Sequence, residues 1–89
     1  MSVKAEVVIK NHSGLHARPA ALFIQTANKF KADIVVSSGV KQVNAKSIIS
    51  VLSLGARGGT QVTIEAEGPD AEQAVKDLVF LLATIDEGE

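Results

Sequence analysis

Two segments of the chain alternate apolar with polar residues, and this pattern constrains the fold more than any other feature. The apolar positions are Val3, Ala5, Val7 and Ile9 in the first segment and Val62, Ile64 and Ala66 within residues 61–67. A period of two residues is typical of a strand with one buried face and one solvated face. Such strands pair antiparallel, and their sheet requires cover on one side only. The rest of the chain is therefore expected to supply helices for that side.

Three further segments have the helical spacing of apolar residues. The first helix begins around Ala17, the second covers residues 48–54 and stops at Gly55, and the third follows Asp70. Asp70 is expected to cap the third helix, with Gln73 in the capping-box position. The stripe of the first helix is Pro19, Leu22, Phe23, Ala27 and Phe30, and that of the third, ending near Gly88, is Ala71, Ala74, Val75, Leu78, Leu82 and Ile85.

Residues 32–38 and 40–43 are predicted to form a hairpin with its turn at Ser38 and Gly39. The order of elements is then strand, helix, strand, strand, helix, strand, helix. We expect an α+β fold, a two-layer open-faced sandwich in which a four-stranded antiparallel sheet carries three helices on one face. A length of 89 residues predicts a single domain spanning residues 1–89.

The composition excludes several classes of protein. There are no cysteines, so disulfides and thiolate metal sites are excluded. Residues 1–10 lack the unbroken apolar stretch of a signal peptide, and no window reaches the ~18 apolar residues of a membrane span. A net charge of −1 gives no bulk attraction to nucleic acid or anionic lipid. We therefore expect a cytoplasmic protein without nucleic-acid partners and without membrane insertion.

The most informative segment is residues 14–20, which read Gly-Leu-His-Ala-Arg-Pro-Ala. His16 takes the N-cap place of the first helix, where Ser, Thr, Asp or Asn would be more stabilising. An imidazole there lies beside free backbone amides and the positive end of the helix dipole, which together bind anions such as phosphate. The dipole also disfavours the imidazolium and leaves a neutral, nucleophilic ring nitrogen. Arg18 adds a planar fork of donors for phosphate oxygens. This combination favours phosphoryl transfer, and an idle surface histidine is the alternative.

A metal site is the other interpretation of these histidines. His12 and His16 are four residues apart, as metal ligands on a helix are. Gly14 lies between them, the helix begins only at His16, and no carboxylate is adjacent. We therefore predict neither a metal site nor a cofactor.

The second helix has more apolar surface than one core can cover. Its five apolar side chains spread over about 220° of arc, whereas a usual stripe covers about 100°. Val51 and Leu54 are expected to point inward. The exposed patch then consists of Ile48, Ile49 and Leu52. Apolar patches of this kind mark partner interfaces, and the alternative is that Ile49 alone is exposed.

Residues 14–20 resemble the active-site signature of HPr, the phosphocarrier family of the phosphoenolpyruvate-dependent sugar phosphotransferase system. Residues 44–55, which include Ser47, resemble the regulatory serine segment of the same family. The resemblance extends over the length and element order of the whole chain. It implies that His16 receives a phosphoryl group on Nδ1 from phospho-enzyme I and passes it to sugar-specific IIA proteins, and that Arg18 contacts this group. It also implies a monomeric carrier that is not itself an enzyme.

The resemblance gives Ser47 a second role beside the N-cap that its hydroxyl can form. In many HPr proteins the aligned serine is phosphorylated by an ATP-dependent HPr kinase/phosphorylase, which connects the protein to a transcriptional regulator. The added charge would oppose a negatively charged partner that approaches His16. The alternative function is therefore a regulatory adaptor or co-repressor controlled by Ser47. Family members specialised in that way lose the active histidine, and this chain has His16.

The residues aligned with Ile48, Ile49 and Leu52 dock enzyme I, IIA proteins and regulators in the family, so the resemblance implies docking by the patch. The chain departs from common family residues at three positions, namely Ala21, Ile49 and Ser50. None of these departures removes a reacting group. They bear on the preference among partners and on recognition by a kinase.

Overall fold

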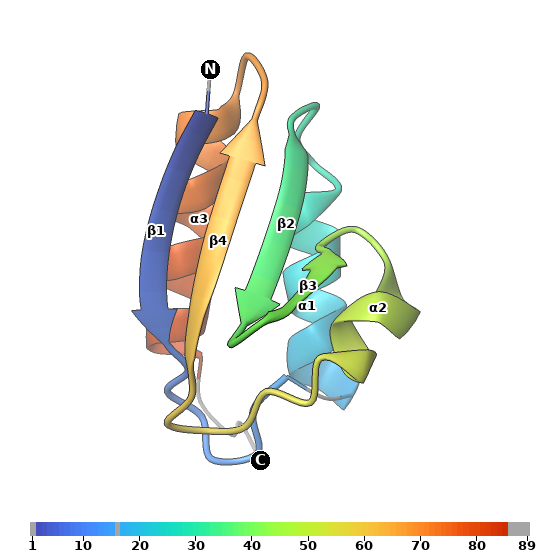
Figure 1. The fold of residues 1–89 in the computed structure, drawn as a ribbon, viewed down its shortest axis with the longest axis vertical. Coiled ribbons are helices and arrows are strands. Elements are labelled where there is room, and N and C mark those ends of the chain that lie inside the picture. Colours follow the sequence, from blue (N-terminus) through green and yellow to red (C-terminus); the bar gives the residue numbers. More distant parts are fainter. Residues whose placement is uncertain (1, 16, 86–89) are drawn as a thin grey trace.

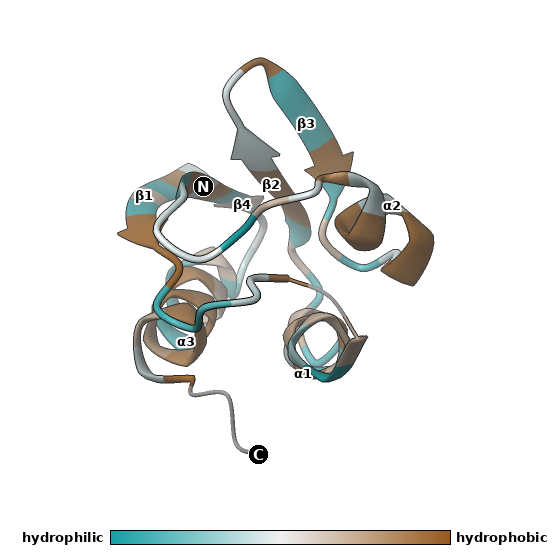
Figure 2. Ribbon diagram, turned by 90° about the horizontal axis from the view of Figure 1, so that it is seen from below, coloured by the Kyte–Doolittle hydropathy of each residue, from teal (hydrophilic) through white to brown (hydrophobic). Residues whose placement is uncertain are grey.

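A four-stranded sheet packs against three helices within residues 2–15 and 17–85, the part of the chain that the computed structural model describes (Figure 1). The strands are β1 (Ser2–Val8), β2 (Asp33–Ser38), β3 (Lys41–Asn44) and β4 (Gln61–Glu67). The helices are α1 (Ala17–Ala27), α2 (Ile48–Ser53) and α3 (Ala71–Thr84). Figure 2 shows α1 and α3 beneath the sheet and α2 next to β3. The predicted α+β open-faced sandwich is confirmed. Each helix of the described residues is too short or too polar to cross a bilayer.

The sheet order is β1-β4-β2-β3, and each neighbouring pair is antiparallel. One row of the register joins Ala5, Ile64, Val36 and Val43 across all four strands. Ile64 and Val36 lie in the central strands and are fully buried, whereas Ala5 and Val43 lie in the edge strands and are partly buried. The alternation in the sequence therefore marks the face that the helices cover.

Helix α3 buries the stripe that its spacing predicts as far as Leu82, but the stripe predicted for α1 is only partly confirmed. Pro19 and Leu22 are partly exposed, and Ala20, which was not predicted, is buried. Ala20, Phe23 and Ala27 of α1 are buried, and so are Ala71, Ala74, Val75, Leu78 and Leu82 of α3. Phe30 lies beyond the end of α1 and packs partly against the core. Ile85 is the C-cap of α3 with an extended backbone, so it does not continue the helical stripe. The predicted end near Gly88 lies outside the described residues.

The hairpin between β2 and β3 is shifted by one residue from the prediction. Ser38 pairs with Lys41, which leaves Gly39 and Val40 as a two-residue loop and places the second strand at residues 41–44. Gly39 has a φ of 62°, a backbone conformation that two-residue hairpins require and glycine adopts readily. Val40, predicted as the first residue of the strand, is instead fully exposed in the loop.

The prediction of a side-chain cap at Asp70 is wrong. Asp70 occupies the N-cap position of α3, but its side chain makes no capping hydrogen bond. Its carboxylate accepts hydrogen bonds from Lys31 N at 2.8 Å and Ala32 N at 2.9 Å, across the fold in the α1–β2 turn. The bond from Lys31 N in particular holds the pKa of Asp70 below its ordinary value. Gln73 donates to Asp77 Oδ1 instead of completing a capping box.

Candidate functional site

The backbone that leads into α1 is held against the loop between α2 and β4. We name residues 54–60 the α2–β4 loop. Its backbone bonds to residues 9–15 are Ile9 N to Thr60 O (2.9 Å), Gly59 N to Ile9 O (2.9 Å), Gly58 N to His12 O (3.1 Å) and Leu15 N to Ala56 O (2.9 Å). Because these groups are obligatory donors and acceptors, the pairing fixes the path of the chain up to Leu15.

Two glycines make this close approach possible. A Cβ at Gly58 would collide with the carbonyl oxygens of Asn11 and His12, and a Cβ at Gly14 would collide with Ala56 O. Gly14 also has a φ of 74°, in the left-handed region that glycine occupies without a steric cost. The two segments therefore meet backbone to backbone, without side chains between them.

Asn11 closes the turn just before α1 and is the one buried polar residue among those described. Its Nδ2 donates to Gly14 O at 2.9 Å, and its own carbonyl accepts from Gly14 N at 3.2 Å. Within residues 2–15 and 17–85, the buried Oδ1 of Asn11 has no hydrogen-bond partner. These two bonds engage both the backbone N–H and the backbone carbonyl of Gly14, and they make the turn rigid.

The N-terminus of α1 presents a positive helix end at the surface. Leu15 is buried, whereas Ala17 and Arg18 are exposed. Ala17 has a φ of 47°, a left-handed conformation that costs a non-glycine residue about 1–3 kcal/mol and is concentrated at functional sites. The first turn of α1 contains no acidic residue, so no carboxylate there offsets the helix dipole. His16 itself lies outside the described residues, and its place as N-cap stays a prediction.

The apolar residues of α2, together with Leu54 after it, divide into a buried and an exposed group, as their angular positions around the helix predict. Val51 is fully buried, and Leu54, directly after the helix, is 8% exposed. The exposed apolar residues are Ile48 (43%), Ile49 (76%) and Leu52 (42%). The predicted patch therefore exists as a surface, and the alternative with Ile49 alone exposed is wrong. Helices α1 and α2 contact each other (Figures 1 and 2). We use the name α1–α2 face for the exposed residues Arg18 of α1 and Ile48, Ile49 and Leu52 of α2.

Ser47 is the N-cap of α2, as predicted. Its hydroxyl accepts a hydrogen bond from Ser50 N at 3.3 Å, and its backbone is extended. Lys46 Nζ donates to Phe30 O at 2.6 Å, and Asn28 Nδ2 donates to Lys46 O at 3.4 Å. The start of α2 is thus tied to the chain just after α1, and the Lys46 ammonium points to that junction.

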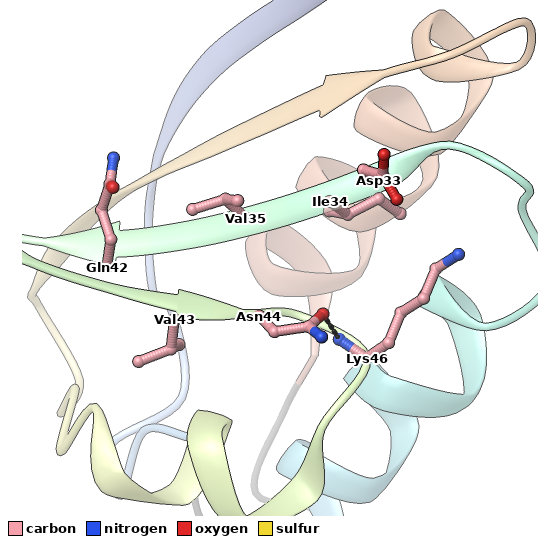
Figure 3. Close-up of a pocket in the computed structure, with 7 residues that line it drawn as sticks. All are labelled: Asp33, Ile34, Val35, Gln42, Val43, Asn44 and Lys46. Atoms are coloured by element: carbon pink, nitrogen blue, oxygen red, sulfur yellow. Dashed lines mark hydrogen bonds between the residues drawn. The ribbon is translucent and has the colours of Figure 1, made fainter.

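A pocket of about 340 Å³ lies along the other side of this junction (Figure 3). It is lined by Asp33, Ile34, Val35, Gln42, Val43, Asn44 and Lys46. Asn44 Oδ1 accepts a hydrogen bond from Lys46 N at 2.9 Å, drawn as a dashed line in Figure 3. The described lining residues come from β2, β3 and the turn before α2. The pocket is therefore separate from the N-terminus of α1.

Sequence reasoning gave Asn11, Gly58 and Arg57 no role in the site, because their places depend on contacts between distant segments. One available signal was the distribution of charge. Residues 7–32 and 34–64 contain no Asp or Glu, although the whole chain has ten. They contain seven of the nine basic residues, namely Lys10, Arg18, Lys29, Lys31, Lys41, Lys46 and Arg57. The near-neutral net charge therefore conceals a strong local excess of cations.

The described residues contain no cluster of three His, Asp or Glu side chains that could hold a metal ion. The groups that are present at the end of α1 are instead backbone amides and a guanidinium, which bind oxyanions.

Comparison with known proteins gives consistent results. The sequence model of a family described as the PTS HPr component phosphorylation site matches residues 3–84. The phosphocarrier protein HPr of Vibrio cholerae is 49% identical over 77 residues, 86% of this chain and 91% of that protein. The HPr-like protein Crh of Bacillus subtilis is 45% identical over 76 residues, 85% of this chain and 89% of that protein. A crystal structure of HPr from Thermoanaerobacter tengcongensis superposes with a TM-score of 0.88 at 52% identity, covering 90% of each chain.

Proposed function

This chain belongs to the HPr family of phosphocarriers of the phosphotransferase system, and on that premise we propose that it accepts a phosphoryl group on His16 from phospho-enzyme I and passes it to sugar-specific IIA proteins. The observation that carries the proposal is the exposed, positively polarised N-terminus of α1, with His16 directly before it and Arg18 in its first turn. The chain acts as a carrier and as a substrate of its partners, not as an enzyme.

The chemistry requires a neutral imidazole and a place for the oxyanion. The lone pair of His16 Nδ1 attacks the phosphorus, the new P–N bond forms, and the bond to the donor residue of phospho-enzyme I breaks. The same exchange in reverse loads the acceptor protein. The amides at the N-terminus of α1 and the guanidinium of Arg18 balance the negative charge of the phosphoryl oxygens. Since the phosphoramidate bond is readily cleaved by another nucleophile, the group stays transferable.

Both partners are proposed to dock on the α1–α2 face. The exposed fractions of Ile48, Ile49 and Leu52 provide apolar surface beside a cationic site, and exposed apolar patches with polar rims are typical of protein interfaces. One face that serves donor and acceptor in turn fits a carrier. We further infer that residues 1–89 act in the cytoplasm as one domain and as a monomer, so that this face is open between encounters.

The direct test is labelling with phosphoenolpyruvate and enzyme I, followed by mass spectrometry to locate the phosphate. Wild-type chain is expected to carry acid-labile phosphate on His16. His16→Ala should carry none and should keep the wild-type circular dichroism spectrum. Arg18→Ala should slow labelling more than it alters stability, because its guanidinium is proposed to contact the phosphoryl group. Full labelling of His16→Ala would exclude the assignment.

A second candidate function is favoured by the similarity to the HPr-like protein Crh and by the position of Ser47. In this case the chain is a regulatory adaptor, and an HPr kinase/phosphorylase phosphorylates Ser47 for recognition by a transcriptional regulator. A phosphate at the N-cap is compatible with the helix, because anions are favourable at a helix N-terminus.

The two functions are separated by the phosphate donor. Labelling that appears only with ATP and a kinase, and is lost in Ser47→Ala, supports the adaptor. Labelling with phosphoenolpyruvate and enzyme I that survives in Ser47→Ala supports the carrier. Ser47→Asn is the matched control, because asparagine preserves a capping oxygen at this position, removes the hydroxyl and adds no charge.

A further inference from the structure

The α2–β4 loop contributes a second guanidinium to the surroundings of the proposed phosphoryl site. We propose that Arg57 is a partner-binding residue whose guanidinium pairs with a carboxylate of the phosphoryl-donor protein, an inference that rests on the proposed carrier function. Arg57 is not part of the apolar patch on α2, and it is distant in sequence from residues 14–20. Only the packing of two loops brings it to this end of the molecule.

The backbone of Arg57 is fixed beside the turn that precedes α1. A Cβ built on Gly14 would lie 2.5 Å from Arg57 Cα, so the two residues are in direct backbone contact. The neighbouring residues, Ala56 and Gly58, bond to Leu15 N and His12 O. The chain reaches His16 two residues after Gly14, and two residues span at most about 7 Å. The long side chain of Arg57 therefore starts next to Gly14, which precedes the proposed phosphoryl acceptor by two residues.

The loop is rigid at Arg57 while its guanidinium is available. Arg57 N donates to Thr60 Oγ1 at 3.3 Å, and Arg57 O accepts from Thr60 N at 3.0 Å. Arg57 is exposed, and no hydrogen bond or ion pair of its guanidinium occurs within residues 2–15 and 17–85. Lys41 and Lys46 differ in this respect, because their ammonium groups already bind Ser53 O and Phe30 O.

The charge around Arg57 selects an acidic partner. The described loops 9–15 and 54–60 and helices α1 and α2 contain no carboxylate, so nothing in them competes for the guanidinium or attenuates its potential. Lys76 on α3, by contrast, has Glu72 and Asp77 on the same helix. A guanidinium binds carboxylates with a planar fork, and complementary charge at an interface rim accelerates docking in a salt-dependent way. The donor surface opposite this loop is accordingly expected to carry Asp or Glu.

The test measures phosphoryl transfer from phospho-enzyme I as a function of the concentration of this chain, at low and high salt. Arg57→Gln is compared with Lys76→Gln, which removes the same charge from α3, and with Arg57→Lys. At low salt we expect Arg57→Gln to raise KM about threefold with kcat unchanged, because the contribution of an exposed ion pair is small; a threefold change corresponds to about 0.65 kcal/mol. The difference should vanish at high salt. Lys76→Gln should have the wild-type KM. Arg57→Lys should have a KM close to that of wild type, because it keeps the positive charge.

A second readout separates a partner carboxylate from the phosphoryl group itself. The isolated phosphorylated chain should lose its phosphate at the same rate in Arg57→Gln and in wild type, because no partner is present. A changed loss rate with an unchanged KM would overturn the proposal by assigning the guanidinium to the phosphoryl group. An Arg57→Gln KM equal to wild type, or an equal rise in Lys76→Gln, would overturn it too. A wild-type chain that accepts no phosphate would instead overturn the carrier function, and this inference with it.

Discussion

Helices α2 and α3 are both rich in apolar residues, but they use them in opposite ways. In α3 the apolar residues repeat along one stripe, and five of them are buried against the sheet and α1. In α2 the apolar residues spread well beyond one stripe, and Val51 is the one buried residue within its bounds. A six-residue helix with little core contact adds little to stability by itself. The comparison teaches that α3 holds the fold together, whereas α2 presents surface.

The same contrast separates the charges. The α1–α2 face and the α2–β4 loop carry basic residues and no carboxylate, while α3 has Glu72 in its first turn, where it stabilises the helix. The first turn of α1 lacks the acidic residue that would stabilise it, and Ala17 adds backbone strain at the same place. The part of the molecule proposed for phosphoryl transfer is thus less stable by itself than the part around α3. The packing of the sheet and α3 stabilises the fold that holds it.

The largest expected effect tests the structural side of the comparison. Leu78→Ala in α3 should lower the free energy of unfolding by about 2–5 kcal/mol, because Leu78 is fully buried and the change leaves a cavity. Phe80→Ala is the control two residues further on, where 69% of the side chain is exposed, and it should stay within about 0.5 kcal/mol of wild type. Urea unfolding followed by circular dichroism measures both. If both variants lost the same free energy of unfolding, the assignment of Leu78 to the buried stripe of α3 and of Phe80 to its exposed side would be wrong.

The next effect tests the support of the candidate site. Gly58→Ala should cost about 1–3 kcal/mol of stability and slow phosphoryl acceptance, because the new Cβ displaces residues 9–15. Gly55→Ala is the control. Its φ of 66° strains an alanine by about 1–2 kcal/mol, but its Cβ meets no atom within 4 Å, so acceptance should be unchanged. The idea of a loop-supported site fails if both variants accept phosphate at the wild-type rate.

A smaller effect tests the proposal that α2 presents its apolar surface to a partner. Leu52→Glu on α2 should raise the KM of phosphoryl transfer from enzyme I about tenfold, which corresponds to about 1.4 kcal/mol of binding. Its effect on the free energy of unfolding should be about 1 kcal/mol, since 42% of the side chain is already exposed. Phe80→Glu places the same charge on the exposed side of α3 and should leave KM unchanged. If Phe80→Glu weakens transfer as much as Leu52→Glu, the two helices do not differ as proposed.

The smallest effect concerns the junction of α3 with the α1–β2 turn. Because hydrogen bonds in the folded state lower the pKa of Asp70, its stabilisation is present above the ordinary aspartate value near 3.8. It is lost as the pH falls through the lower, folded-state pKa. Asp70→Asn should therefore be less stable than wild type at neutral pH, and the two should converge in acid below about pH 4. Thermal unfolding between pH 7 and pH 2 measures this, and parallel curves would contradict the carboxylate's role.

The Ser47 cap and the α2 patch were predictable because their signals are local, and the roles of His16 and Arg18 stay predictions of the same kind. A histidine in the N-cap place, an arginine two residues later and a serine before an apolar helix each follow from short-range rules, and the resemblance to HPr combined them. The Ser47 cap and the exposed α2 residues were found where the sequence placed them. The roles of Asp70 and Gly58 were not predictable in the same way. Each depends on a backbone segment that is remote in sequence and near only in the folded chain.

The sequence by itself determined the spacing of apolar residues along each segment. That spacing determined the type of each element, the face that each strand buries and the helix that exposes apolar surface. Tertiary structure alone decided which loops touch, that the carboxylate of Asp70 crosses to another turn, and that Arg57 lies against Gly14. The physical reason is that hydrophobic burial follows a residue's periodic position along its own element. Backbone hydrogen bonds between loops are instead satisfied by whichever distant groups the packed layers bring within reach.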